Sequence, residues 1–360
     1  MDRREYHTLD ALRGVAALGV VVLHAEVMDG SASRWMPSAY LAVDLFFVLS
    51  GFVLDHAYRQ RFVGGMGAGE FMRARYIRLY PLYALGVVIG LISAVAALVL
   101  GAGELGVVGL VIAAVAAMLL LPSPTWSEAP GVFPANVPGW SLFFELAVNL
   151  VFAATYRFLT RRVLALVIAL SAMVLALAVV TAGHADLGSS WSGFWGGFPR
   201  VSFSFFAGVL LCRLYSGGGG GGRGALAWLL PMVLLPIFMV APPEGLRPVF
   251  DLIAVLLVFP AIIALAARCE PGAAGARLFR WVGVISFPIY AIHYPVLELM
   301  RRSLHALHLD ALYAPAMAAA CVGLVIASWL LVRFYDEPMR AALTRWVRAG
   351  GMRVRASAQR

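Results

Sequence analysis

The sequence predicts an all-α fold, a polytopic bundle of about ten transmembrane helices, and three observations support this. Of the 360 residues, 62% are hydrophobic and 13% are charged, whereas a soluble domain is about 45–50% apolar and about 25% charged. The mean hydropathy is +0.86. The apolar residues lie in runs of about 18–25, the length that crosses a hydrocarbon core of about 30 Å. The runs lack the short alternating pattern of a membrane barrel, so helices are expected.

Eleven apolar runs follow one another along the chain. They cover residues 9–28, 39–58, 79–100, 104–121, 139–157, 163–182, 198–214, 225–241, 247–267, 283–300 and 311–334. Connections rich in arginine are expected in the cytoplasm. On that basis a single crossing must join Arg78 to Pro122, although two runs lie between them. We therefore expect 104–121 to be re-entrant or interfacial. Ten helices are favoured over eleven, because ten crossings place both termini in the cytoplasm.

The remaining composition argues for one membrane domain and against several other classes of protein. Residues 1–340 are expected to form the domain embedded in the lipid bilayer, and 341–360 a basic cytoplasmic tail. The net charge of +9 is attributed to arginines retained on the cytoplasmic side, so no nucleic-acid partner is expected. The three cysteines lack metal-ligand spacing, and no metal is expected. The six glycines at 217–222 predict a flexible linker rather than a phosphate-binding loop.

The first helix carries two polar residues on one face. Arg13 and His24 are eleven positions apart, which is about 16 Å along a helix. Charged or titratable groups inside a membrane usually mark a functional site. A histidine is suited to proton transfer near neutral pH or to brief carriage of an acyl group. The alternative is an interfacial, hydrogen-bonded histidine with an arginine that extends to the lipid headgroups.

The second helix places a carboxylate at the predicted depth of His24. Asp44 could orient the imidazole and stabilise its protonated form, as carboxylates do in catalytic triads. Ser50 and Gly51, further along the same helix, favour close helix packing over catalysis.

Paired arginines begin the third helix. Arg75 and Arg78 are three residues apart and share one helical face, with Arg73 just before them. Guanidinium groups recognise phosphates well, because each presents a rigid fork of donors. The residues suit a nucleotide-bearing cofactor that arrives from the cytoplasm. Topology determination and contact with lipid headgroups are the alternative explanation.

Two later helices carry further polar residues. Trp140 and Ser141 open the fifth helix, and Glu145 lies about one and a half turns inside it. Glu145 is expected to face the bundle as a base, a substrate ligand or the ion-pair partner of Arg200. In the tenth helix three polar residues share one face, which suggests a lined cavity or, equally, a polar contact between helices. They are Ser286, Tyr290 and His293.

Taken together, these segments resemble acyltransferase family 3, membrane O-acyltransferases that modify bacterial surface and secreted carbohydrates. The resemblance spans residues 9–340 in the order of the family's motifs. It rests on 9–14 (LDALRG) with the Arg13-to-His24 spacing, 43–52 (VDLFFVLSGF), the Arg75/Arg78 pair, 140–142 with Glu145, Ser286 with Tyr290 and His293, and 335–340 (YDEPMR). The departures are Asp336-Glu337, where one acidic residue is typical, and the missing aromatic run after Glu145.

The resemblance implies a mainly ten-helix fold in the bacterial inner membrane, acetyl-CoA as donor and a carbohydrate hydroxyl as acceptor. It implies His24 as the catalytic residue and Arg13 as its motif partner. From the residues themselves, we expect Asp44 or Glu145 to help His24. Arg73, Arg75 and Arg78 are expected to bind CoA. The expected acceptor path comprises Trp140, Ser141, Arg200, Ser286, Tyr290 and His293. A stand-alone form is expected, since the chain ends soon after its helices.

Two other classes of function remain open from the sequence. A transporter would also bury charges and break helices with Gly and Pro, although no inverted repeat is visible. A non-catalytic scaffold for an envelope glycan intermediate would tolerate the loss of His24. Release of a thiol from acetyl-CoA separates an enzyme from both.

Overall fold

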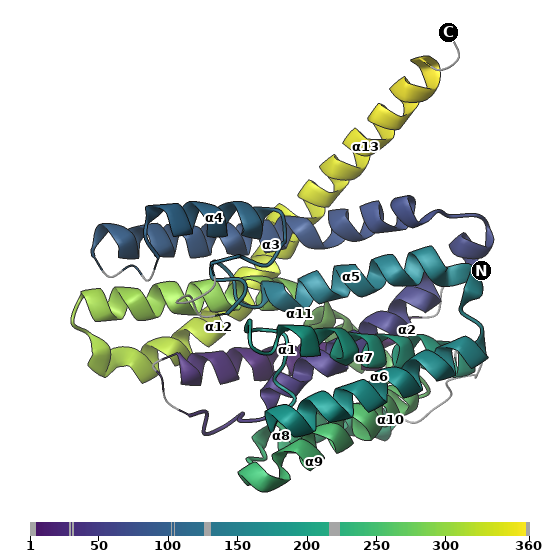
Figure 1. Ribbon diagram of the computed structural model, residues 1–360, viewed down its shortest axis with the longest axis horizontal. Helices are drawn as coiled ribbons and strands as arrows, with labels where there is room; N and C mark the ends of the chain where they lie inside the picture. The colour runs from purple at the N-terminus through teal and green to yellow at the C-terminus, as the bar shows by residue number, and fades with distance from the viewer. Residues whose placement is uncertain are drawn as a thin grey trace.

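The computed structural model describes residues 5–28, 30, 32–101, 103, 105–125, 131–215 and 224–357, with side chains up to 349. The predicted glycine linker, 217–222, lies outside these residues. Within the described ranges the regular structure is entirely helical, which confirms the all-α prediction. Figure 1 shows most of the helices running roughly along one common direction, with α13 projecting from the bundle towards the C-terminus.

Each predicted apolar run overlaps at least one helix, and one further helix follows the last run. Their bounds are α1 His7–Val27, α2 Ala42–Val63, α3 Ala68–Val99, α4 Val107–Met118, α5 Gly139–Thr155, α6 Arg161–Ala182, α7 Gly197–Tyr215, α8 Gly224–Met239, α9 Arg247–Ile253, α10 Phe259–Ala266, α11 Ala273–Ala306, α12 Tyr313–Leu331 and α13 Glu337–Ser357. A π-helical segment, Ala254–Val258, joins α9 to α10, and a second, Val332–Asp336, joins α12 to α13.

Nine helical segments of the described chain are long and apolar enough to cross a membrane. The apolar helices α4 and α8 are shorter. The 12 residues of α4 extend only about 18 Å, less than the hydrocarbon core. Its length therefore agrees with the prediction that 104–121 does not make a complete crossing. In Figure 1, α4 lies alongside α3 at one edge of the bundle.

Two helices begin earlier than hydropathy suggested. Helix α3 starts at Ala68 instead of residue 79, and α11 starts at Ala273 instead of 283. Hydropathy detects the apolar part of a helix, but arginine is also a good helix former. The predicted phosphate-binding arginines therefore lie on a helical turn and not in a loop.

Glycines bring α2 and α7 into close contact. A Cβ atom at Gly51 would collide with the backbone oxygen of Phe205, and one at Gly208 would collide with the backbone oxygen of Val48. Small residues allow helix backbones to approach closely in membranes. The expected packing role of Gly51 is therefore seen in the structure, and one face of α2 is directed at α7.

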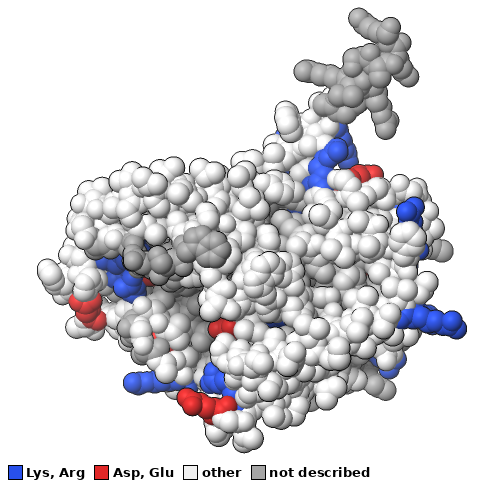
Figure 2. Space-filling model, viewed as in Figure 1, with Lys and Arg blue, Asp and Glu red and all other residues white. Residues whose placement is uncertain are grey.

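The exterior of the bundle is largely apolar. Large hydrophobic side chains are exposed on several helices, for example Val111, Leu166, Leu177 and Trp329. In Figure 2 the middle of the visible face is mostly uncharged, and arginines and carboxylates gather towards its margins and the base of α13. This distribution fits a multi-pass protein whose outer surface faces lipid.

Candidate active site

Two cavities lie at opposite ends of α1. The first, called the arginine cavity, measures about 390 Å³ and lies at the N-terminal end. Its polar lining includes Asp10, Arg13, Ser50, His56, Arg75, Arg78, Ser141, Glu145, Arg280 and Ser286. The second, called the histidine cavity, measures about 380 Å³ and lies at the C-terminal end. Its lining includes His24, Tyr40, Trp140, Asp186 and Arg247. Val43 and Tyr290 line both, so the cavities share a wall.

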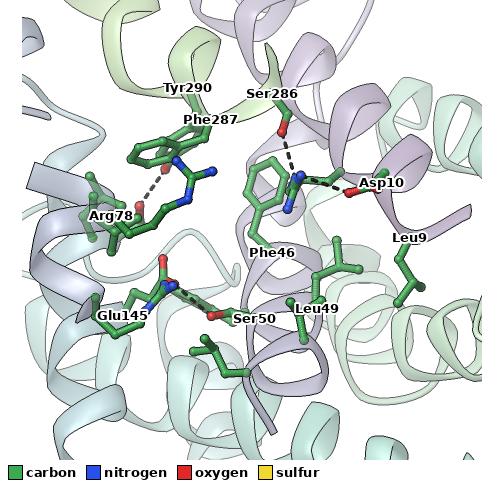
Figure 3. Close-up of a pocket in the computed structure, with 18 of the residues that line it drawn as sticks. Leu9, Asp10, Phe46, Leu49, Ser50, Arg78, Glu145, Ser286, Phe287 and Tyr290 are labelled. Atoms are coloured by element: carbon green, nitrogen blue, oxygen red, sulfur yellow. Dashed lines mark hydrogen bonds and ion pairs between the residues drawn. The ribbon is translucent and has the colours of Figure 1, made fainter. Parts of the chain in front are cut away.

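The predicted donor-binding arginines Arg75 and Arg78 line the arginine cavity, as Figure 3 shows for Arg78. Arg75 Nη2 donates to Glu145 Oε1 at 2.6 Å. Arg78 Nη1 donates to Asp336 Oδ2 at 3.3 Å, and its side chain remains 36% exposed. A guanidinium has five N–H donors, so one ion pair holds it in place and leaves other donors for a ligand.

The structure corrects the grouping of Arg73 with these arginines. Its side chain is exposed and does not line the arginine cavity. The reason is helical periodicity. Arg75 and Arg78 are three apart and share a face of α3, whereas Arg73 precedes Arg75 by two residues and points away from that face.

Arg13 joins α1 to α11 at the edge of the same cavity. Its Nε donates to Ser286 Oγ at 2.9 Å, and its Nη2 donates to the Gly283 carbonyl at 2.7 Å and to Asp10 Oδ1 at 3.1 Å. Ser286 and Asp10, both labelled in Figure 3, are the two side chains that accept from this guanidinium. Arg13 and His24 belong to different cavities and do not contact each other, so the motif marks both ends of one helix.

His24 contacts His293, a partner that the sequence did not indicate. His24 Nδ1 lies 2.9 Å from His293 Nε2, and the ring centroids are 5.0 Å apart. His293 is fully buried and lines neither cavity, which corrects its expected place on the acceptor path. Of its predicted companions, Tyr290 lines both cavities, whereas Ser286 lines only the arginine cavity. The Tyr290 hydroxyl hydrogen-bonds Ser141 Oγ at 2.7 Å.

The structure also corrects the expected pairing of Asp44 with His24. Asp44 instead accepts hydrogen bonds from Arg200 Nε at 3.0 Å and from Arg200 Nη2 at 2.8 Å. Both side chains are fully buried, and neither lines the two cavities. Arg200 is therefore not part of the acceptor path. The physical reason is the close contact of α2 with α7, which turns this carboxylate towards Arg200.

Glu145 lies in the arginine cavity and does not contact His24 or Arg200. Its Oε1 accepts hydrogen bonds from Arg75 and, at 2.8 Å, from Ser50 Oγ. Figure 3 shows Glu145 and Ser50 in contact with each other in the wall of this cavity. Of the three roles that the sequence left open, a ligand at the arginine cavity fits this position.

Sequence reasoning missed several polar residues of the histidine cavity. Tyr40 donates to both oxygens of Asp251, at 2.7 and 2.8 Å. Asp186 comes from the connection between α6 and α7, and Arg247 is the first residue of α9. No spacing signal linked them to His24, because they lie far from it in the chain. Among the described residues, no group of three or more His, Cys, Asp or Glu side chains lies close enough to hold a metal ion.

Comparisons with known proteins agree with this arrangement of motifs. A family model, the acyltransferase 3 model described as "Acyltransferase domain", matches residues 6–333. "Acyltransferase MdmB" of Streptomyces mycarofaciens is 27% identical over 378 aligned residues, which cover 94% of this chain and 92% of that protein. "Protein 2 in picA locus" of Rhizobium radiobacter is 42% identical over 184 residues, 47% of this chain and 92% of that protein. No solved structure matches significantly.

The family match covers most of the chain and includes both cavities, the Arg13-to-His24 pair and the arginines of α3. Its extent agrees with the resemblance that the motifs carry, except that the match ends before 335–340. The protein therefore belongs to the acyltransferase 3 family and is a multi-pass membrane acyltransferase.

Proposed function

We propose that the protein transfers an acyl group, specifically acetyl, from acyl-CoA to a hydroxyl group of a cell-surface or exported carbohydrate in the bacterial inner membrane. The observation that carries this proposal is the pair of cavities at opposite ends of α1, which share Val43 and Tyr290 as wall residues. One cavity offers cations for a phosphorylated donor, and the other offers a histidine for the acceptor. An acyl group passes from one to the other at the shared wall.

The arginine cavity suits the donor. It lies at the N-terminal end of α1, and the nearby C-terminal end of α2 carries Arg59 and Arg61. The preference for basic residues on the cytoplasmic side assigns this end to the cytoplasm, where acyl-CoA is made. Arg75 and Arg78 bind the CoA phosphates in this proposal. Apolar walls such as Phe46 accommodate the acyl-bearing arm.

The histidine cavity suits a carbohydrate. Trp140 and Tyr40 provide aromatic surfaces, and Asp186 and Arg247 provide an acceptor and donors of hydrogen bonds. The apolar faces of a sugar ring match the aromatic surfaces, and its hydroxyl groups match the hydrogen-bonding side chains. This cavity lies at the opposite end of α1 from the proposed cytoplasmic end, so in this proposal it receives an acceptor from the outer side of the membrane.

His24 acts as the general base in the proposed reaction. It accepts the proton of the acceptor hydroxyl while the hydroxyl oxygen attacks the thioester carbonyl. The C–S bond breaks, and His24 returns the proton to the CoA sulfur. The products are an ester and free CoA, so all atoms and charges balance. A positioned base of this kind contributes about 10²–10⁴-fold to the rate.

The test uses purified protein in lipid vesicles with radiolabelled acetyl-CoA and crude cell-envelope glycan. The native protein is expected to release CoA and to label the glycan. His24→Ala is expected to lower both by about 10²-fold or more. His305→Asn is the matched control, because His305 is an exposed histidine on α11 that lines neither cavity.

Three outcomes would contradict the proposal in different ways. Donor binding without CoA release would favour a transporter or scaffold over an enzyme. Equal activity of native protein and His24→Ala would remove the assigned base. Acid-labile label on the native protein would replace general-base catalysis by a covalent acyl-histidine.

A further inference from the structure

The His24–His293 contact determines which ring nitrogens carry protons as well as the position of the His24 ring. Each neutral imidazole has one protonated nitrogen, which donates, and one unprotonated nitrogen, which accepts. Which nitrogen carries the proton is set by the hydrogen bond that the other nitrogen makes. The contacts of the two rings therefore determine which nitrogen of His24 is available as a base.

The backbone of α11 determines the protonation of His293. His293 Nδ1 lies 2.9 Å from the carbonyl oxygen of Tyr290 and 3.2 Å from that of Ile289. A carbonyl oxygen can only accept, so Nδ1 must carry the proton. In the neutral ring Nε2 then holds a lone pair. His293 is 0% exposed and its described hydrogen bonds are to neutral groups, so a charged ring would be costly there.

The lone pair on His293 Nε2 determines the protonation of His24. His24 Nδ1 lies 2.9 Å from this nitrogen and must donate to it. His24 Nε2 is then left unprotonated, on a ring that lines the histidine cavity. This is the tautomer that a general base for an acceptor hydroxyl requires.

The surrounding helix holds His293 in this orientation. Pro295 has no N–H for the carbonyl of Ala291, four residues earlier. The side-chain amide of Asn136 donates to that carbonyl at 3.0 Å. Asn136, in the segment before α5, therefore replaces the backbone hydrogen bond that Pro295 cannot make. This contact holds the turn of α11 that carries His293.

We infer that His293 is a positioning residue that holds His24 in its Nδ1-protonated tautomer and directs the unprotonated Nε2 to the acceptor. This inference rests on the proposed function. In a catalytic triad a carboxylate performs this task. Here a neutral imidazole does so, because the two carboxylates predicted to help His24 are bound elsewhere: Asp44 to Arg200, and Glu145 to Arg75. When His24 takes up the acceptor proton at Nε2, its Nδ1–H remains bonded to His293.

Two substitutions of His293 test the roles of its two ring nitrogens separately. A glutamine amide reaches the place of the imidazole Nε2 and can accept from His24, whereas an asparagine amide reaches only the place of Nδ1. We expect His293→Asn to lower turnover by about 10²-fold while the KM for acetyl-CoA stays unchanged. His293→Gln should recover a measurable part of that turnover. Equal losses in both variants, or full turnover in His293→Asn, would overturn the inference.

A second measurement does not depend on activity. Native protein with ¹⁵N-labelled histidine in lipid bilayers is measured by solid-state NMR, and His24→Asn and His293→Asn assign the two signals. Both rings are expected to be protonated at Nδ1 and unprotonated at Nε2. A proton on His24 Nε2 would refute the inference even if the enzyme is active. The expected tautomers in a protein that releases no CoA would refute the proposed function instead.

Discussion

The buried pair of Asp44 and Arg200 gives a prediction that distinguishes a structural carboxylate from a catalytic one. Both side chains are 0% exposed. Arg200 also donates from Nη1 to the Leu187 carbonyl and from Nη2 to the Tyr40 carbonyl, each at 2.9 Å. Asp44→Ala removes the buried negative charge and leaves the guanidinium with these two carbonyls and with Asp186, a half-exposed carboxylate whose Oδ1 lies 4.0 Å from Arg200 Nη1.

The magnitude follows from the burial. Removing one partner of a buried ion pair costs about 3–5 kcal/mol, because the remaining charge loses its compensation. Replacing both partners by apolar residues of similar volume is often nearly neutral. We therefore expect Asp44→Ala to lower the free energy of unfolding by about 3–5 kcal/mol. The double variant Asp44→Leu/Arg200→Met should be more stable than Asp44→Ala.

The assay is unfolding in mixed micelles with increasing dodecyl sulfate, followed by tryptophan fluorescence, for native protein, both single variants and the double variant. The interaction energy from this cycle should be large, since the two residues are in direct contact. CoA release is measured on the folded fraction of each variant. Asp44→Ala with native stability and no CoA release would refute this reasoning and restore Asp44 as a helper of the catalytic histidine.

Three further substitutions test other parts of the site. Arg78→Gln should raise the KM for acetyl-CoA about 10-fold or more through loss of a charge-assisted hydrogen bond. Arg73→Gln should leave the KM unchanged. Equal effects of the two substitutions would contradict the conclusion that only Arg78 of this pair faces the arginine cavity. Gly51→Ala should reduce the yield of folded protein, because its Cβ meets backbone of α7, whereas Gly69→Ala has open space; equal yields by size-exclusion chromatography would argue against that contact. Tyr290→Trp places a larger side chain between the two cavities and should block acyl transfer while acetyl-CoA still binds. A native rate of transfer in this variant would show that the acyl group does not pass at Tyr290.

The sequence predicted the fold class and most of the helices because these depend on local properties. Apolar runs of the right length must form helices in lipid, whatever their neighbours are. The shared face of Arg75 and Arg78 likewise follows from helical periodicity alone. Helix starts were less accurate, since α3 continues through arginines that hydropathy assigns to a connection.

Partner choice between distant residues was decided only by the tertiary structure. The sequence indicated that Asp44 and His24 lie at similar depths, but depth does not specify the rotation of a helix about its axis. The glycine contact between α2 and α7 sets that rotation and directs Asp44 to Arg200. His293 was recognised as part of a polar face, yet its contact with His24 depends on the packing of α1 against α11.

By itself, therefore, the sequence determined a helical membrane bundle, its family motifs and the residues that are costly to bury. The tertiary structure decided that Arg13 and His24 belong to separate cavities, that these cavities share a wall at Tyr290, and that a histidine instead of a carboxylate contacts His24. The physical reason is that hydropathy and periodicity act within one helix. Hydrogen bonds between helices require a particular rotation and register of two helices, which packing of the whole bundle sets.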